Sequence, residues 1–115
     1  MLSRKNRLTG AKSFIRVQSE GKVYQSKNFG IAVVDRSDGA PSRFAFVVST
    51  KIAKEAVDRN RIKRIMGEVI RLNTLNICDG VDFVFLAKPS ITRIPTTEIM
   101  REVKEGLEKE GFLKQ

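Results

Sequence analysis

Residues Phe29–Asp35 read Phe-Gly-Ile-Ala-Val-Val-Asp, a run in which bulky and small side chains alternate. Aromatic and β-branched residues in such a short run are typical of a β-strand, and successive side chains of a strand point to opposite faces of its sheet. The bulky face of this strand would hold Phe29, Ile31 and Val33, and the small face Gly30, Ala32 and Val34. This stretch therefore predicts a sheet with a large core on one face and a close neighbour on the other.

Two further stretches repeat this alternation. Arg43–Ser49 and Val81–Ala87 are predicted strands, and the turn-forming run 37–41 predicts that Arg43–Ser49 returns beside Phe29–Asp35 as a hairpin. Lys22–Gln25 is expected to be a short edge strand. By parity, the bulky face gains Phe44, Phe46, Val48, Phe83 and Phe85, and the small face gains Ala45, Val47 and Ser49.

Three helices are predicted around this sheet. The first spans Gly10–Glu20 and ends at Gly21, the second spans roughly residues 54–73, and the third is capped by Thr96 and runs to Gly111. We expect the second and third helices to cover the bulky face. The first would lie on the small face, either simply packed there or leaving a partly open groove for a single strand of nucleic acid.

The second helix has two unlike sides. At about 100° per residue, its apolar residues gather on one side and most of its polar and basic residues on the other. The apolar side holds Ile62, Ile65, Met66, Val69 and Leu72, and the opposite side holds Asn60, Lys63, Arg64 and Arg71. Such a helix docks on a core and leaves its basic side either to solvent or to an acidic partner.

The charge of the chain favours the acidic partner. Its 115 residues include 22 lysines and arginines against 13 acidic residues, a formal net charge of +9. A field of that sign attracts phosphate backbones, and the arginine forks and amide of Arg59-Asn60-Arg61 suit phosphate oxygens and base edges. The basic arm 1–8 is expected to have little structure of its own. We therefore expect one nucleic-acid-binding domain over residues 1–115.

Composition also excludes several classes of protein. The chain has no histidine, so a histidine general base or histidine metal site is impossible, and its one cysteine, Cys78, is expected to be a small hydrophobe. Asp79 and Asp82 are interpreted as a turn residue and a strand-edge residue rather than as nuclease carboxylates. No apolar run reaches the roughly 18 residues that cross a membrane, and the first residues lack the apolar region of a secretory signal. We expect a cytoplasmic protein with no membrane partner.

Several motifs together resemble the protein subunit of bacterial ribonuclease P. The most specific is Ala56-Val57 followed by Arg59-Asn60-Arg61-Ile62-Lys63-Arg64. Matches in the family's order over nearly the whole chain are Asn6-Arg7-Leu8, Phe14 before Gly21, Ser49-x-Lys51 and Ala87-Lys88-Pro89.

The resemblance implies an α+β fold, a single-domain α-β-β-β-α-β-α sandwich whose mixed central sheet contains a left-handed β-α-β crossover. General topology rules favour the other hand. It also implies a ribonucleoprotein endoribonuclease in which the RNA, with bound Mg²⁺, hydrolyses precursor tRNA at the mature 5′ end. The protein would bind ribonuclease P RNA as a 1:1 complex and hold the single-stranded 5′ leader of precursor tRNA.

Residue roles implied by the resemblance fall into two sets, neither of them catalytic or metal-ligating. The RNA-binding set is Arg59, Asn60, Arg61, Lys63, Arg64, Arg71, Lys51, Arg4, Asn6 and Arg7. The leader-binding set is Phe14, Gln18, Ala32, Lys12 and Ser49.

Three positions depart from the family's pattern. Gln18 and Ala32 stand where better-known members present aromatic residues to the leader, which predicts weaker base stacking. Gly67 stands where a basic residue is common, which predicts an interrupted basic face. The alternative function is a general RNA-binding or ribosomal-type structural protein.

Overall fold

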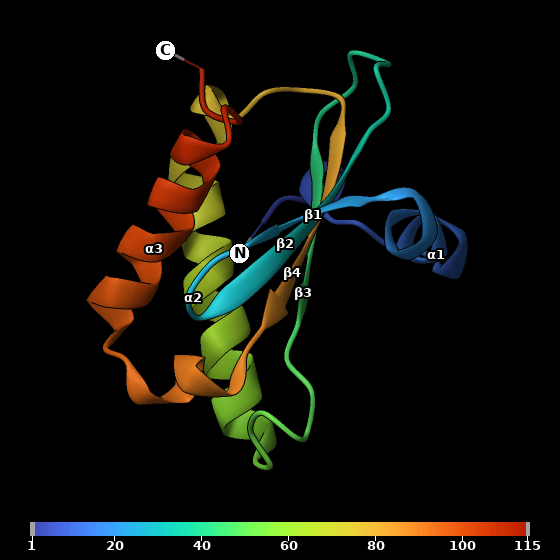
Figure 1. Cartoon of the computed structure of the whole chain (residues 1–115). Coiled ribbons are helices and arrows are strands. Elements are labelled where there is room, and N and C mark those ends of the chain that lie inside the picture. The colour runs from blue at the N-terminus through green and yellow to red at the C-terminus, as the bar shows by residue number, and fades with distance from the viewer. Residues whose placement is uncertain (1, 115) are drawn as a thin grey trace.

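The computed structural model describes residues 2–114, and its sheet separates one helix from two others (Figure 1). In chain order the elements are α1 (Ala11–Glu20), β1 (Lys22–Gln25), β2 (Phe29–Asp35), β3 (Arg43–Val47), α2 (Ala56–Asn73), β4 (Val81–Ala87) and α3 (Thr96–Lys109). Short 3-10 turns lie at Arg4–Asn6, Thr74–Asn76 and Pro89–Arg93. The α-β-β-β-α-β-α order expected from the resemblance is confirmed.

The strand order is β1-β2-β4-β3, so β4 lies between β2 and β3 and the predicted hairpin of the latter two is wrong. β4 pairs antiparallel with β2 and parallel with β3. A turn motif reverses the chain but does not choose the partner of the next strand. β4 occupies the inner position beside β2, and its first five residues are buried, whereas β3 at the edge is mostly half-buried. The short β1 is an edge strand, as predicted.

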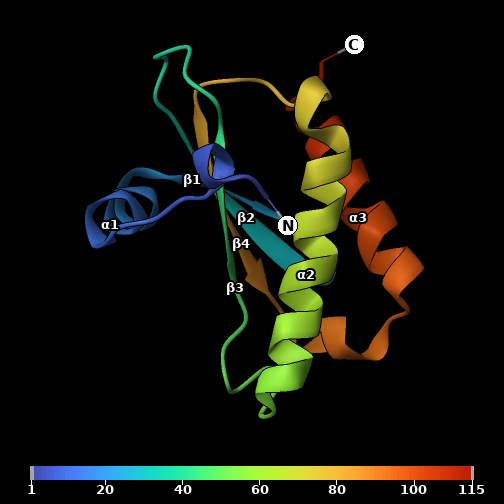
Figure 2. The same ribbon diagram turned by 180° about the vertical axis from the view of Figure 1, so that it is seen from behind.

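Parallel neighbours need a crossover connection, and α2 supplies it between β3 and β4. In Figures 1 and 2 the two strands run the same way while α2 returns along one face of the sheet. With β3 outside β4 in the strand order, this connection is left-handed. The crossover thus places α2 next to the outer edge of the sheet at β3.

The bulky face of the sheet forms the main core. Phe29, Phe83 and Phe85 are completely buried there. They pack in one cluster with Ile62, Met66, Val69 and Ile70 of α2 and with Ile99, Val103 and Leu107 of α3. Leu72, predicted to face the core, is 60% exposed. Ile70 is completely buried instead. The sheet and α3 both pack on α2, so together they bury more of its surface than the single row of apolar residues that was predicted.

Two helix ends show how local sequence acts. Gly21 ends α1 as predicted, and a Cβ there would lie 2.2 Å from the carbonyl oxygen of Val17, so no other residue fits. The prediction that Thr96 caps α3 is wrong. It is the first helical residue and follows Pro95, which occupies the N-cap without a side-chain hydrogen bond.

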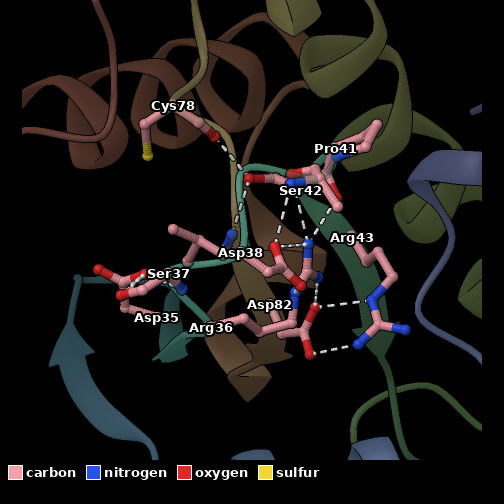
Figure 3. A network of polar contacts seen from close by, with 11 residues as sticks. Asp35, Arg36, Ser37, Asp38, Pro41, Ser42, Arg43, Cys78 and Asp82 are labelled. Atoms are coloured by element: carbon pink, nitrogen blue, oxygen red, sulfur yellow. Dashed lines mark hydrogen bonds and ion pairs between the residues drawn. The ribbon is translucent and has the colours of Figure 1, made fainter.

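Asp82, expected to be a strand-edge residue, is the second residue of the inner strand β4 and is completely buried. Its carboxylate accepts hydrogen bonds from Arg43 Nε at 2.8 Å and Nη2 at 2.7 Å, and from Arg36 Nη1 (Figure 3). Arg36 stands just after β2 and Arg43 at the start of β3, so one carboxylate joins the three strands at one end of the sheet.

We expect Asp82→Asn to lower the free energy of unfolding by about 3 kcal/mol, because it leaves two guanidinium groups together without their counter-charge. The measurement is urea denaturation followed by circular dichroism. Asp79→Asn is the matched control, since Asp79 is exposed and its one ion pair within residues 2–114 is with Lys114 at 3.8 Å. Its effect should stay below about 0.5 kcal/mol, and equal effects of the two variants would contradict the role of Asp82.

Candidate nucleic-acid interface

The N-terminal arm was expected to have little structure of its own, but its described residues, 2–8, form a 3-10 turn and dock on the sheet; Met1 lies outside the described residues. The backbone N–H of Leu8 donates to the carbonyl of Phe44 at 2.9 Å, which places the arm along the free edge of β3. Asn6 is buried, and its side-chain amide donates to the carbonyl of Ser42 at 2.9 Å while its oxygen accepts from Ser3. Asn6, predicted to bind RNA, is therefore committed to holding the arm on the sheet.

A groove of about 580 Å³ lies between this arm, the edge of β3 and the basic side of α2. The helix contributes Asn60, Lys63 and Arg64, and the arm contributes Arg7. These four predicted RNA-binding residues come from segments more than 50 positions apart, yet the fold brings them around one opening. Their spacing along α2 follows the helical repeat, which puts positions three and four apart on the same side.

The two cations on the α2 side of the groove are unpaired. Among residues 2–114, neither Lys63 nor Arg64 forms an ion pair with a carboxylate. Arg71 on the same side differs, because its Nε donates to Glu68 at 3.0 Å. This hydrogen bond lowers the pKa of Glu68 and raises the pKa of Arg71. Positive charge is thus concentrated on the first half of the helix.

The Arg59-Asn60-Arg61 motif does not act as one patch. Arg59 turns back and donates through Nη1 to the carbonyls of Ala53 at 2.9 Å and Lys54 at 2.7 Å, closing the loop that enters α2. Arg61 does not line the groove but a shallow hollow between α2 and α3, which Thr96 and Met100 of α3 also line and which Arg64 borders as well. Consecutive helical residues diverge by about 100°, so only Asn60 of the three faces the groove.

The remaining predicted RNA-binding residues, Arg4 and Lys51, are exposed but do not line this groove. Arg4 lies in the 3-10 turn of the arm and Lys51 in the loop after β3. They extend the positive charge along the β3 side of the molecule without joining the residues that line the groove.

The prediction that Gly67 interrupts an exposed basic face is wrong. Gly67 is buried, and it lies on the side of α2 that lines the groove. A Cβ at this position would lie 3.7 Å from Cε2 of Phe46, which also lines the groove. Phe46 was predicted to be a core residue, and its half-burial at the β3 edge could not be foreseen from parity alone.

On the opposite face of the sheet, α1 packs over β2 and β4 through Val17, which is 1% exposed. Ala32, predicted to line the leader groove, is only 4% exposed beneath this helix and is not accessible. Of the two alternatives for the first helix, simple packing or a partly open groove, simple packing is correct on this part of the face.

Beyond α1 the same face is less covered. Phe14 of α1, Val47 of β3 and Leu86 of β4 are half-buried around the second core cluster, and Val47 is the register partner of Leu86. The other predicted leader residues, Lys12, Gln18 and Ser49, are exposed. Figure 1 shows α1 crossing one half of this face, with the far ends of β3 and β4 extending past it. The structure therefore offers an open strip rather than an enclosed groove.

The carboxylates near the sheet are engaged in internal contacts. Burial acts to raise the pKa of Glu102, but hydrogen bonds from Ser26 and from the side chain and backbone of Asn28 outweigh burial and lower it. Burial raises the pKa of the Cys78 thiol, which is half-buried as expected. Within residues 2–114, no three carboxylate or thiol side chains gather as a metal site would require.

The described part of the chain, residues 2–114, contains no helix with the length and apolar character needed to cross a membrane.

Comparison with known proteins gives a single family. The model of the family "Ribonuclease P" matches residues 2–111. A ribonuclease P protein component from Oleidesulfovibrio alaskensis is 32% identical, covering 96% of each chain. One from Dehalococcoides mccartyi is 36% identical over 94% of this chain and 87% of its own.

Solved structures agree. The RNase P protein from Staphylococcus aureus superposes with a TM-score of 0.87 at 21% identity, covering 95% of this chain and 98% of that one. The RNase P protein from Thermotoga maritima gives 0.80 at 25% identity, covering 90% and 96%. The first likeness concerns the fold, and the α+β architecture with its mixed sheet is thereby confirmed.

We expect Arg64→Ala to weaken binding of structured RNA and to make the slope of log affinity against log salt shallower by about one, because one phosphate contact is lost. Filter binding at several salt concentrations measures both quantities. Arg101→Ala is the control, since Arg101 is exposed on α3 and meets Glu105 at 3.9 Å. A slope unchanged by Arg64→Ala would show that Arg64 does not touch phosphate.

Proposed function

The chain belongs to the ribonuclease P protein family, and we propose that it binds RNA through two separate surfaces. Proteins of this family are partners of ribonuclease P RNA in the endoribonuclease that processes the 5′ end of tRNA. The α2–arm groove with its basic rim binds the RNA subunit. The open strip beside α1 holds the single-stranded 5′ leader of precursor tRNA. The cleavage chemistry belongs to the RNA.

The observation that carries this proposal is the pair of unpaired cations, Lys63 and Arg64, beside Asn60 and Arg7. Phosphate contacts position a protein on nucleic acid and account for much of the affinity. A rigid helix fixed by Ile62 and Met66, both completely buried, presents these groups without a large loss of conformational freedom on binding. This favours docking on a folded RNA over loose electrostatic association.

The leader proposal is supported by size and chemistry. Val47, Leu86 and Phe14 form an apolar strip; Lys12, two residues before Phe14, and Ser49, two residues after Val47, are exposed. Extended single strands bind such surfaces by placing bases on apolar or aromatic side chains and phosphates beside cations. With Gln18 exposed on α1 and Ala32 buried, Phe14 is the one aromatic residue of the predicted leader set.

We propose that the Mg²⁺ of the holoenzyme is bound mainly through RNA, since the residues described here offer no cluster of carboxylates for it. Mg²⁺ bound there supplies the chemistry of phosphodiester hydrolysis. The contribution of this chain is its positive charge, which neutralises phosphates that would otherwise recruit cations. The complex would contain one protein per RNA and act in the cytoplasm.

Adding the protein to ribonuclease P RNA should lower the Mg²⁺ concentration needed for cleavage of precursor tRNA, because lysine and arginine replace part of the counter-ion atmosphere. The measurement is the cleavage rate over a Mg²⁺ titration, with and without the protein. If the protein binds the RNA but leaves the Mg²⁺ requirement unchanged, the general RNA-binding function is the correct one.

Phe14→Ala should weaken the affinity of the reconstituted complex for precursor tRNA by about 1 kcal/mol, the lower range of one base stacked on an aromatic ring, and leave mature tRNA unaffected. Ile15→Ala is the control, because Ile15 is the neighbouring residue of α1 and 59% exposed. Equal losses for precursor and mature tRNA would show that α1 does not contact the leader.

A further inference from the structure

The groove between α2 and the arm has an aromatic floor beneath its cationic rim. Phe44 and Phe46 of β3 contribute the floor, and Leu2 and Leu8 of the arm close one end. The ring of Phe46 packs against Phe85 of the core with centroids 5.5 Å apart, so it is held in place from below. The volume of the groove, about 580 Å³, lies in the range of small-molecule binding sites.

Gly67 is what leaves this ring accessible from the helix side. The residue lies inside α2, where a glycine lowers helix stability relative to alanine. No positive φ requires it, and a Cβ would meet Phe46 only at an ordinary contact distance of 3.7 Å. Neither backbone geometry nor crowding therefore explains a glycine here, whereas a larger side chain would occupy the space above the ring.

The cationic rim of the groove suits the phosphate of a nucleotide, as the aromatic floor suits its base. Lys63 and Arg64 form no ion pairs within residues 2–114, and Asn60 adds an amide that can donate and accept. An aromatic surface with cations at its edge suits a base and its phosphate together. A base within an A-form helix is stacked and paired, so only an unpaired nucleotide can present its face in this way.

We infer that this groove receives one unpaired base of ribonuclease P RNA, stacked on Phe46, with its phosphate against Lys63 and Arg64. The inference rests on the proposed function, in which the same side of α2 binds that RNA, and it adds a defined pocket to an otherwise electrostatic contact. It also gives Gly67 a binding role.

The first test fills the groove. Gly67→Leu should weaken the affinity for ribonuclease P RNA by about fivefold or more, the lower range of one stacked base. Gly106→Leu is the matched control, since Gly106 lies inside α3 and its Cβ would lie 3.7 Å from Cζ of Phe29, away from the groove. Thermal unfolding of both variants verifies that they are folded. An unchanged affinity in folded Gly67→Leu overturns the inference.

The second test identifies what lies against Phe46. Phe46→p-azidophenylalanine, photolysed in the complex, should crosslink to one unpaired nucleotide, mapped by reverse transcription, and adding Gly67→Leu should abolish that crosslink. Crosslinks absent, or spread over paired regions, overturn the inference. So does a groove occupied by a second copy of the chain, seen as concentration-dependent sedimentation that Gly67→Leu abolishes.

The two levels of proposal fail separately. If the wild-type protein lowers the Mg²⁺ requirement for precursor cleavage while Gly67→Leu binds the RNA normally, the proposed function stands and the base pocket is wrong. If the wild-type protein has no such effect on the Mg²⁺ requirement, the proposed function itself is wrong.

Discussion

The parallel pairing of β3 with β4 is the constraint on which the rest of this structure depends. Parallel neighbours cannot be joined by a tight turn, so the chain must cross over, and α2 makes that crossing along the bulky face. Because β3 is the outer strand, α2 comes to lie beside a free sheet edge. Asp82, held by Arg36 and Arg43, joins the three strands at one end of this arrangement.

Both proposed binding surfaces follow from this position of β3. On one side, its free edge accepts the N-terminal arm, which closes a groove against the basic side of α2. On the other side, α1 packs mainly on β2 and β4, and Val47 of β3 and Leu86 of β4 stay half-buried in an apolar strip. A protein built in this way can contact two segments of RNA at once. Its buried carboxylate, Asp82, is paired with arginines and so holds the strands together.

Much of this could be predicted because it depends on local patterns. Strand boundaries and helix sides follow from alternation and from the 3.6-residue repeat, and these held for β1, β2, β4 and the core side of α2 apart from Leu72. Apart from Leu72 and the cap of α3, the errors concern non-local partners. The turn after β2 does not reveal that β4 inserts beside it, and the arm gave no local sign that Asn6 and Leu8 would dock on β3.

The sequence by itself determined the faces of the strands, the amphipathic α2 and the excess of positive charge, since each depends on the spacing of neighbouring residues. Through its motifs it also indicated the family. Only the tertiary structure decided which basic residues act together, because a helix spreads Arg59, Asn60 and Arg61 in three directions while strand order brings Arg7 to Lys63. Likewise, whether Gly67 is a gap in a charged surface or the opening above Phe46 depends on how α2 is rotated against β3, which packing of the whole core sets.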